Sequence, residues 1–369
     1  MSQPVLNPSK RLASLDAFRG FTIIGMIIVN TPGSWSYVFP PLRHAEWNGL
    51  TPTDLVFPFF LFIVGVSIVL AYSKRLKVNT SKSGLIKKII IRTVLIFAFG
   101  LILNLIGSQF THFRIPGVLQ RIAIVFFFCS LLFLYTTWQT QLITGMLALA
   151  IYYFLMMLVP VPGHGMGVLL PGENLAAYID SIAIPFYLYQ GTWDPEGILS
   201  TLPAIGTGIT GMMAGHILLS GKNIENKVIN LFVLGFFMTI LGEMWGWIFP
   251  INKNIWTSSY VLYTSGLASM TLGVLVWILD VKGFVNWARP GIIFGTNAIT
   301  AYVLSYILLI PFTWFTISGG LNLQGLYMEK MIAAGFMPEL ASMIWAILFT
   351  ALCFIPVWWL YRKRIFIKL

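Results

Sequence analysis

The sequence predicts an all-α protein that crosses the membrane about ten times, with both termini on the cytoplasmic side. Of its 369 residues, 57% are hydrophobic and only 9% are charged, and the mean hydropathy is +0.83. Soluble domains carry about 25% charged residues, so this composition excludes an ordinary soluble protein. The charged residues gather in short segments between long apolar runs, which is how membrane proteins encode their topology.

Ten apolar runs are long enough to cross a bilayer, which requires about 20 apolar residues per helix. Pro311 and the Gly319-Gly320 pair make 311–340 the region where a helix is expected to break or end. No small-residue cleavage site follows the first run, so we expect that run to remain as the first helix. Residues 1–369 are expected to form one integral membrane domain. The ten predicted spans are 14–33, 54–73, 88–107, 117–135, 141–159, 200–219, 228–248, 258–279, 292–314 and 341–361.

Basic residues give the expected orientation. With a cytoplasmic N-terminus, 18 of the 23 Lys and Arg residues fall on the inner side, which is the distribution that the positive-inside rule favours. The formal charge of +11 therefore reflects topology, and we expect the lipid bilayer rather than a nucleic acid as a partner. The expected location is the inner membrane of the cell. The five basic residues left outside are Arg43, Arg114, Arg121, Lys253 and Lys330.

The longest connection, residues 160–199, is expected to be an extracytoplasmic loop. It contains no Lys or Arg and is rich in acidic and aromatic residues, including Asp180, Trp193, Asp194 and Glu196. Loops of this length are uncommon unless they are functional. An acidic, aromatic loop suits a sugar or an amine, or it forms a lid packed over the helix ends.

The polar segment between the first two spans contains the first candidate site. His44 has Arg43, Glu46 and Asp54 within ten residues. Imidazole accepts protons near neutral pH, so His44 is a candidate base, although a single His is more often a hydrogen-bonded structural residue. Thr51-Pro52-Thr53-Asp54 is a capping-box pattern, which explains Asp54 unless its carboxylate also orients the imidazole.

Polar residues at the two ends of the first span have local explanations and functional ones. Asn30 ends the apolar run and fits a helix cap, or it donates a hydrogen bond to a developing oxyanion. Asp16 and Arg19 are three residues apart and can pair along a helix, or Arg19 can help to bind an anion.

Arg114 and Arg121 form the third candidate site, around the start of the fourth span. They are seven residues apart and are therefore expected on one helix face, with Arg121 inside the membrane. An ionisable residue inside a span usually faces a polar pocket, although a long side chain can also extend to the interface. No metal-binding or Walker motif occurs in the sequence.

Several ordered motifs resemble the heparan-α-glucosaminide N-acetyltransferase family, most closely its bacterial NagX-like members. The resemblance covers the first eight spans well and the last two weakly. The motifs are Ser14-Leu15-Asp16-Ala17-Phe18-Arg19-Gly20, Asn30, His44-Ala45-Glu46-Trp47-Asn48-Gly49-Leu50 with Asp54, Arg114-Ile115-Pro116-Gly117-Val118-Leu119-Gln120-Arg121, Asp194-Pro195-Glu196-Gly197 and Lys253-Asn254-Ile255-Trp256-Thr257-Ser258-Ser259-Tyr260.

The resemblance implies transfer of an acetyl group from acetyl-CoA to the amine of a glucosamine unit. The family's active-site histidine corresponds to His44 and its catalytic asparagine to Asn30. Lysosomal members have a glycine-rich segment after the asparagine where this chain reads Thr31-Pro32-Gly33-Ser34-Trp35-Ser36-Tyr37. Free glucosamine or another small amino sugar is therefore the expected acceptor.

The remaining expectations concern the binding of each substrate. Arg19 and Arg121 are candidates for binding acetyl-CoA, and Arg114, Glu46 and Asp54 are candidates for the substrate pocket. His44 either removes a proton from the amine or accepts the acetyl group itself. The sequence is also compatible with a homodimer. The alternative functions are an amino-sugar or N-acetylglucosamine transporter and a membrane scaffold without chemistry, although the scaffold leaves His44 and Arg121 unexplained.

Overall fold

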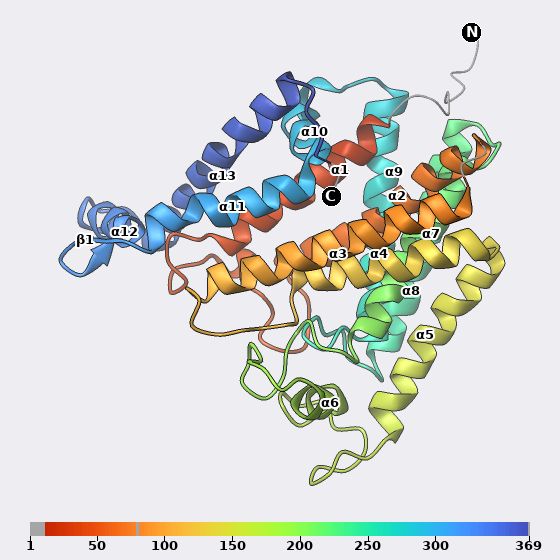
Figure 1. Ribbon diagram of the computed structural model, residues 1–369, viewed down its shortest axis with the longest axis horizontal. Helices are drawn as coiled ribbons and strands as arrows, with labels where there is room; N and C mark the ends of the chain where they lie inside the picture. The colour runs from red at the N-terminus through yellow and green to blue at the C-terminus, as the bar shows by residue number, and fades with distance from the viewer. Residues whose placement is uncertain (1–11, 79–80, 368–369) are drawn as a thin grey trace. The chain divides into compact units, whose positions relative to one another are not determined.

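The computed structural model describes residues 12–78 and 81–367 and is built almost entirely of helices (Figure 1). Among those residues, nine helices are long and apolar enough to cross a membrane, and a bent helix pair makes up to ten. The prediction of an all-α, multi-pass membrane protein is therefore confirmed. Lys10, Arg11 and Lys368, which contribute to the predicted charge distribution, lie outside the described residues.

The chain divides into two compact units, which are described separately. Unit 1 contains Glu46–Gly49 and Pro58–Trp277, and unit 2 contains Leu12–Ala45, Leu50–Phe57 and the chain from Ile278 onward. The helices of unit 1 are α2 (Val56–Lys77, whose first two residues belong to unit 2), α3 (Lys82–Gly107), α4 (Val118–Tyr135), α5 (Trp138–Leu158), α6 (Leu175–Ala183), α7 (Thr201–Leu219), α8 (Ile224–Gly246) and α9 (Ser258–Leu275).

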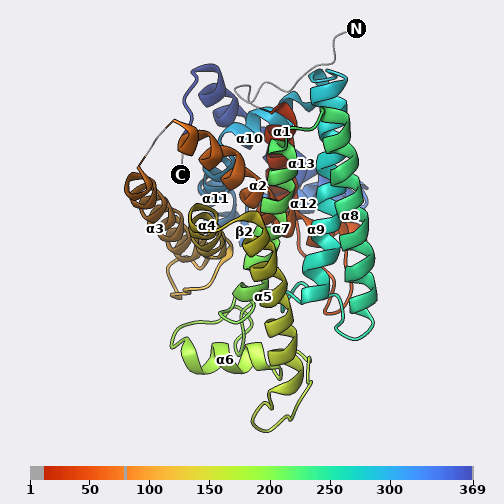
Figure 2. The same cartoon turned by 90° about the vertical axis from the view of Figure 1, so that its right-hand side faces the viewer.

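Small residues allow close helix packing in unit 1. A Cβ atom at Gly65 of α2 would lie 1.9 Å from the carbonyl oxygen of Gly208 in α7, so only glycine fits there. Between α8 and α9, Gly235 and Gly266 allow the same close approach, and the two helices run side by side (Figure 2). Such contacts are typical of membrane helices, where close packing replaces the hydrophobic effect.

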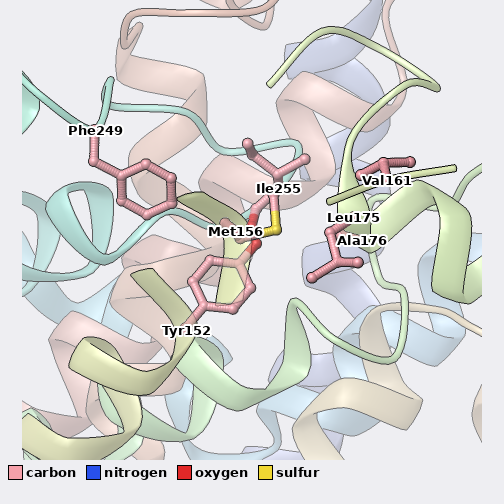
Figure 3. Close-up of a cluster of buried hydrophobic side chains, with 7 residues drawn as sticks. All are labelled: Tyr152, Met156, Val161, Leu175, Ala176, Phe249 and Ile255. Carbon is pink, nitrogen blue, oxygen red and sulfur yellow. Dashed lines mark hydrogen bonds between the residues drawn. The ribbon is translucent and has the colours of Figure 1, made fainter. Parts of the chain in front are cut away.

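A buried cluster joins α5, the start of α6 and the segment between α8 and α9 (Figure 3). The hydroxyl of Tyr152 on α5 donates a hydrogen bond to the carbonyl oxygen of Ile255, and Phe249 packs against the Tyr152 ring. Trp47 also packs against this cluster. The cluster therefore connects the chain just after His44 with the loop that follows α5. Its members are Tyr152, Met156, Val161, Leu175, Ala176, Phe249 and Ile255.

Unit 2 is organised around α1. A Cβ atom at Gly20 of α1 would lie 1.6 Å from the carbonyl oxygen of Gly291 in α10, so these two helices cross in direct backbone contact. Pro311 lies inside α11, and Gly319 and Gly320 form the turn between two short strands, both with positive φ. The elements are α1 (Ala13–Asn30), α10 (Arg289–Thr296), α11 (Ala298–Thr313), β1 (Thr316–Ser318), β2 (Leu321–Asn322), α12 (Leu323–Ala333) and α13 (Pro338–Arg362).

The ninth span differs from the single helix expected over 292–314. It is a pair of helices, α10 and α11, bent by 79° at Asn297. The Asn297 amide donates to the carbonyl oxygen of Ile365 at 3.0 Å and accepts from the Ile367 N–H at 2.9 Å. These bonds connect the helix break to residues that follow α13. The sequence around Asn297 does not reveal partners so far away.

Candidate active site

His44 and Asp54 form a hydrogen-bonded pair in unit 2. The Nδ1 atom of His44 lies 2.7 Å from Oδ1 of Asp54, which sits in a 3-10 turn (Pro52–Leu55) before α2. The Asp54 side chain is 1% exposed, whereas the His44 side chain is 45% exposed. A buried carboxylate therefore holds an imidazole that remains accessible.

The second carboxylate oxygen of Asp54 fixes the surrounding loop. It accepts hydrogen bonds from the backbone N–H groups of Ala45 and Thr51 and from the Thr51 hydroxyl, each at 3.0 Å. The bond from the Thr51 N–H belongs to the predicted capping box. Asp54 thus performs both roles that the sequence allows, because it caps the turn and also contacts His44.

This geometry determines how the imidazole can react. A carboxylate that accepts from Nδ1–H selects the neutral tautomer with its proton on Nδ1 and its lone pair on Nε2. The same carboxylate stabilises the imidazolium that forms when Nε2 takes up a proton or an acyl group. The arrangement therefore suits a general base or a nucleophile.

Asn30 is the last residue of α1, and Thr31 occupies the cap position after it. The Thr31 hydroxyl donates to the carbonyl oxygen of Ile27 at 2.7 Å. The Asn30 amide is half-buried and makes no hydrogen bond within the described part of the chain. Capping of α1 therefore does not account for Asn30.

The residues after His44 are anchored in unit 1. Trp47 Nε1 donates to the carbonyl oxygen of Leu169 at 2.9 Å, and the Trp47 ring meets Trp193 edge-to-face at 5.2 Å between centroids. The Asn48 side chain accepts from Asn252 at 3.1 Å. Glu46, in contrast, is exposed, and its carboxylate makes no ion pair among the described residues.

Arg114 forms ion pairs with two acidic residues of unit 1. Its Nε and Nη2 atoms donate to the two oxygens of Asp194 at 2.7 and 2.6 Å, and Nη2 also lies 2.6 Å from Oε2 of Glu196. Burial alone would lower the pKa of Arg114, but the bonds to the two carboxylates outweigh burial and raise it. The guanidinium is therefore permanently charged and is bound by two carboxylates.

Arg121 is almost completely buried in α4. Its Nη2 atom donates to Ser200 Oγ at 2.5 Å and to the Gly197 carbonyl oxygen at 3.2 Å, and its guanidinium lies 5.0 Å from the ring centre of Trp256. Its Nε and Nη1 atoms have no hydrogen-bond partner in the described structure. Arg121 thus supports the turn that leads into α7.

Asp180 on α6 completes this network. Its carboxylate accepts from the N–H groups of Ile198 at 2.8 Å and Asp194 at 3.3 Å. Burial raises the pKa of Asp180 to about 6. A Cβ atom at position 197 would lie 1.9 Å from the Asp180 carboxylate, which explains Gly197 in the Asp194-Pro195-Glu196-Gly197 motif.

At the start of α1, Arg19 pairs with Asp16 as the sequence predicts. Its Nη1 atom lies 3.2 Å from Oδ1 of Asp16 and donates to the carbonyl oxygen of Gly295 in α10 at 3.2 Å. About a fifth of the Arg19 side chain remains exposed.

One expectation about Arg114 and Arg121 is corrected. Arg114 lies before α4, which begins at Val118, so Arg114 and Arg121 do not share a helix face. Both side chains instead contact the segment 194–200, some 80 residues along the chain. Local spacing could not reveal these partners, although Ser200 lies three residues after the Asp194–Gly197 motif and Trp256 lies within the Lys253–Tyr260 motif.

Comparison with known proteins gives consistent matches. A family model described as "Heparan-alpha-glucosaminide N-acetyltransferase, catalytic" matches residues 11–253. The heparan-alpha-glucosaminide N-acetyltransferase of Mus musculus is 32% identical over 371 residues, covering 83% of this chain and 55% of the mouse protein. The Homo sapiens protein of the same name is 33% identical over 366 residues, covering 82% and 54%. The chain therefore spans about half the length of these curated relatives.

Proposed function

Because the chain belongs to the heparan-alpha-glucosaminide N-acetyltransferase family, we propose that it is a transmembrane acetyltransferase. Its acetyl donor is acetyl-CoA, and its acceptor is the amine of glucosamine or a related amino sugar. The observation that carries the proposal is the 2.7 Å contact between His44 and the buried Asp54. The multi-pass fold supports a membrane location, and we propose the inner membrane of the cell.

His44 acts as a general base in the first form of the proposed reaction. The sugar amine attacks the thioester carbonyl, and a carbon–nitrogen bond forms as the carbon–sulfur bond breaks. Nε2 removes the proton from the attacking nitrogen, and this proton then neutralises the departing thiolate. Asp54 stabilises the intervening imidazolium, and the Asn30 amide donates a hydrogen bond to the oxyanion.

His44 acts as a nucleophile in the second form. Nε2 attacks the thioester, the thiol of CoA leaves, and an acetyl-imidazole remains on the protein. The amine then attacks that acetyl group and releases the imidazole. The Nδ1–Asp54 bond assists both forms, because each places positive charge on the imidazole ring.

We assign the substrate-binding roles from the exposure and the hydrogen-bond partners of each side chain. Arg19 is partly exposed and is our candidate for a phosphate of acetyl-CoA. Arg121 is buried against Ser200 and Gly197, so we propose that it contributes to cofactor binding by holding this turn. Glu46 is exposed and is our candidate for an amino-sugar contact, whereas Arg114 supports the loop through Asp194 and Glu196.

The decisive experiment measures CoA release by the full chain purified in detergent with acetyl-CoA and glucosamine. We expect turnover in the wild type and a loss of at least about 100-fold in His44→Ala, since base catalysis contributes about 10²–10⁴-fold. His164→Ala is the matched control, because this exposed histidine lies in the 160–199 loop and has no role in the proposal. Full turnover in His44→Ala would refute the assignment.

A second measurement separates the two forms of the reaction. Protein incubated with radiolabelled acetyl-CoA without acceptor should retain label only if an acetyl-imidazole forms. Label that is absent from His44→Ala and released by glucosamine identifies the nucleophile. Label-free protein with normal turnover identifies the general base.

A transporter of amino sugars is the alternative, and one observation favours it. The 79° break between α10 and α11 resembles the discontinuous helices that bind substrates in secondary transporters. Reconstituted protein that accumulates glucosamine in vesicles without releasing CoA would support transport and reject the enzyme.

A further inference from the structure

Seven basic side chains gather where α2 ends and α3 begins in unit 1. The sequence contains no Asp or Glu between Asp54 and Glu173, so no acidic residue nearby in the sequence balances them. This set is called the basic corner below, and all of its members are exposed. The basic corner comprises Lys74, Arg75, Lys77, Lys82, Lys87, Lys88 and Arg92.

The basic corner continues directly into an exposed apolar face of α3. Lys87 is followed at helical spacing by Ile90, Ile91, Val94 and Leu95, all of which are exposed. Positions i, i+3, i+4, i+7 and i+8 lie on one face of a helix. The ammonium group of Lys87 therefore stands at the polar end of a stripe that would face lipid.

Aromatic residues mark the membrane interface at the same end of unit 1. Lys82 Nζ lies 5.5 Å from the ring centre of Tyr135, the last residue of α4. Tyr135 and Trp138 are 60% and 51% exposed. Exposed Tyr and Trp side chains are enriched at the level of lipid headgroups, so the basic corner lies at that level.

We propose that the basic corner binds the phosphate groups of anionic phospholipids. Headgroup phosphates lie between the hydrocarbon and the water, which is the position that the α3 stripe gives to Lys87 and Lys88. The proposal does not depend on acetyl transfer, because no member of the basic corner has a role in the proposed reaction.

Native mass spectrometry of the full chain in mixed micelles tests this proposal. Wild-type protein should retain phosphatidylglycerol in preference to phosphatidylcholine. Lys87→Gln/Lys88→Gln should reduce that preference about 25-fold, because each basic residue near an anionic surface contributes about fivefold. The matched control, Lys222→Gln/Lys330→Gln, removes the same charge from two exposed residues outside the corner and should change little.

Three outcomes would overturn the proposal. Equal retention of the two lipids by the wild type would show that the corner does not select a headgroup. An equal loss of the preference for phosphatidylglycerol in the two double variants would show that only the total charge matters. Displacement of phosphatidylglycerol by millimolar coenzyme A, but not by inorganic phosphate, would identify a nucleotide site. Normal acetyl transfer by Lys87→Gln/Lys88→Gln is expected, so a failed lipid test leaves the proposed reaction intact.

Discussion

Asp54 and Asp194 are both buried carboxylates with basic partners, but they hold those partners in opposite ways. Asp54 contacts an imidazole that is 45% exposed. Asp194 contacts a guanidinium that is 16% exposed, and Glu196 binds the same guanidinium from a second direction. The first arrangement leaves an imidazole ring accessible, whereas the second holds a guanidinium between two carboxylates.

The expected contribution of the ion pair to stability differs between the two arrangements. Removing one partner of a buried ion pair costs about 3–5 kcal/mol, since the other charge remains buried. A pair with a half-exposed member contributes about 1 kcal/mol or less. We propose that the pairing of Asp54 with an exposed histidine serves to select the tautomer of the imidazole.

Among the variants that test this comparison, Asp54→Asn should have the largest effect, and the effect should be on kcat. The amide cannot stabilise an imidazolium and can select the opposite tautomer, so kcat should fall by about 10²–10⁴-fold. The KM for acetyl-CoA should change little. Steady-state assays in detergent measure both values.

Thr51→Val is the control for the structural role of Asp54. It removes the hydroxyl, which donates to the Arg43 carbonyl oxygen at 2.7 Å and lies 3.0 Å from Asp54, but keeps the Thr51 N–H bond to Asp54 and the contact of Asp54 with His44. Its kcat should remain within about fivefold of the wild type, with a stability loss of about 1 kcal/mol. If Asp54→Asn folds and keeps more than a tenth of wild-type kcat, the pair is structural.

Arg114→Met should have the next largest effect, and on stability rather than on kcat. It leaves Asp194 and Glu196 without their cation, and the expected loss is about 3–5 kcal/mol in the free energy of unfolding. Unfolding of the purified protein in mixed micelles measures this loss. Activity per folded molecule should be preserved.

The triple variant Arg114→Met/Asp194→Asn/Glu196→Gln tests whether unpaired carboxylates cause the stability loss of Arg114→Met. It removes the uncompensated charges together with the cation, so it should recover most of the lost stability. An increase in the KM for the amino sugar in both variants would instead place Arg114 in the substrate pocket.

The sequence predicted nine of the spans and the closeness of Asp54 to His44, because both depend on local information. Hydropathy over about 20 residues defines a span, and a capping box places Asp54 close to a residue ten positions earlier. The partners of Arg114 were not predictable, because Asp194 and Glu196 follow about 80 residues later. The break at Asn297 also depends on distant backbone, that of Ile365 and Ile367.

The smallest expected effect concerns the pH dependence of the buried network. Burial raises the pKa of Asp180 from 3.8 to about 6, so the folded chain binds this proton more tightly than the unfolded chain. The stabilisation is fully present below about pH 4 and is lost as pH rises through about 6, with a total of at most about 3 kcal/mol. Asp180→Asn cannot ionise and should lose less stability over this range. The free energy of unfolding, measured from about pH 4 to pH 7, gives the slope of stability against pH for the wild type and for Asp180→Asn. Equal slopes would show that Asp180 does not titrate in this range.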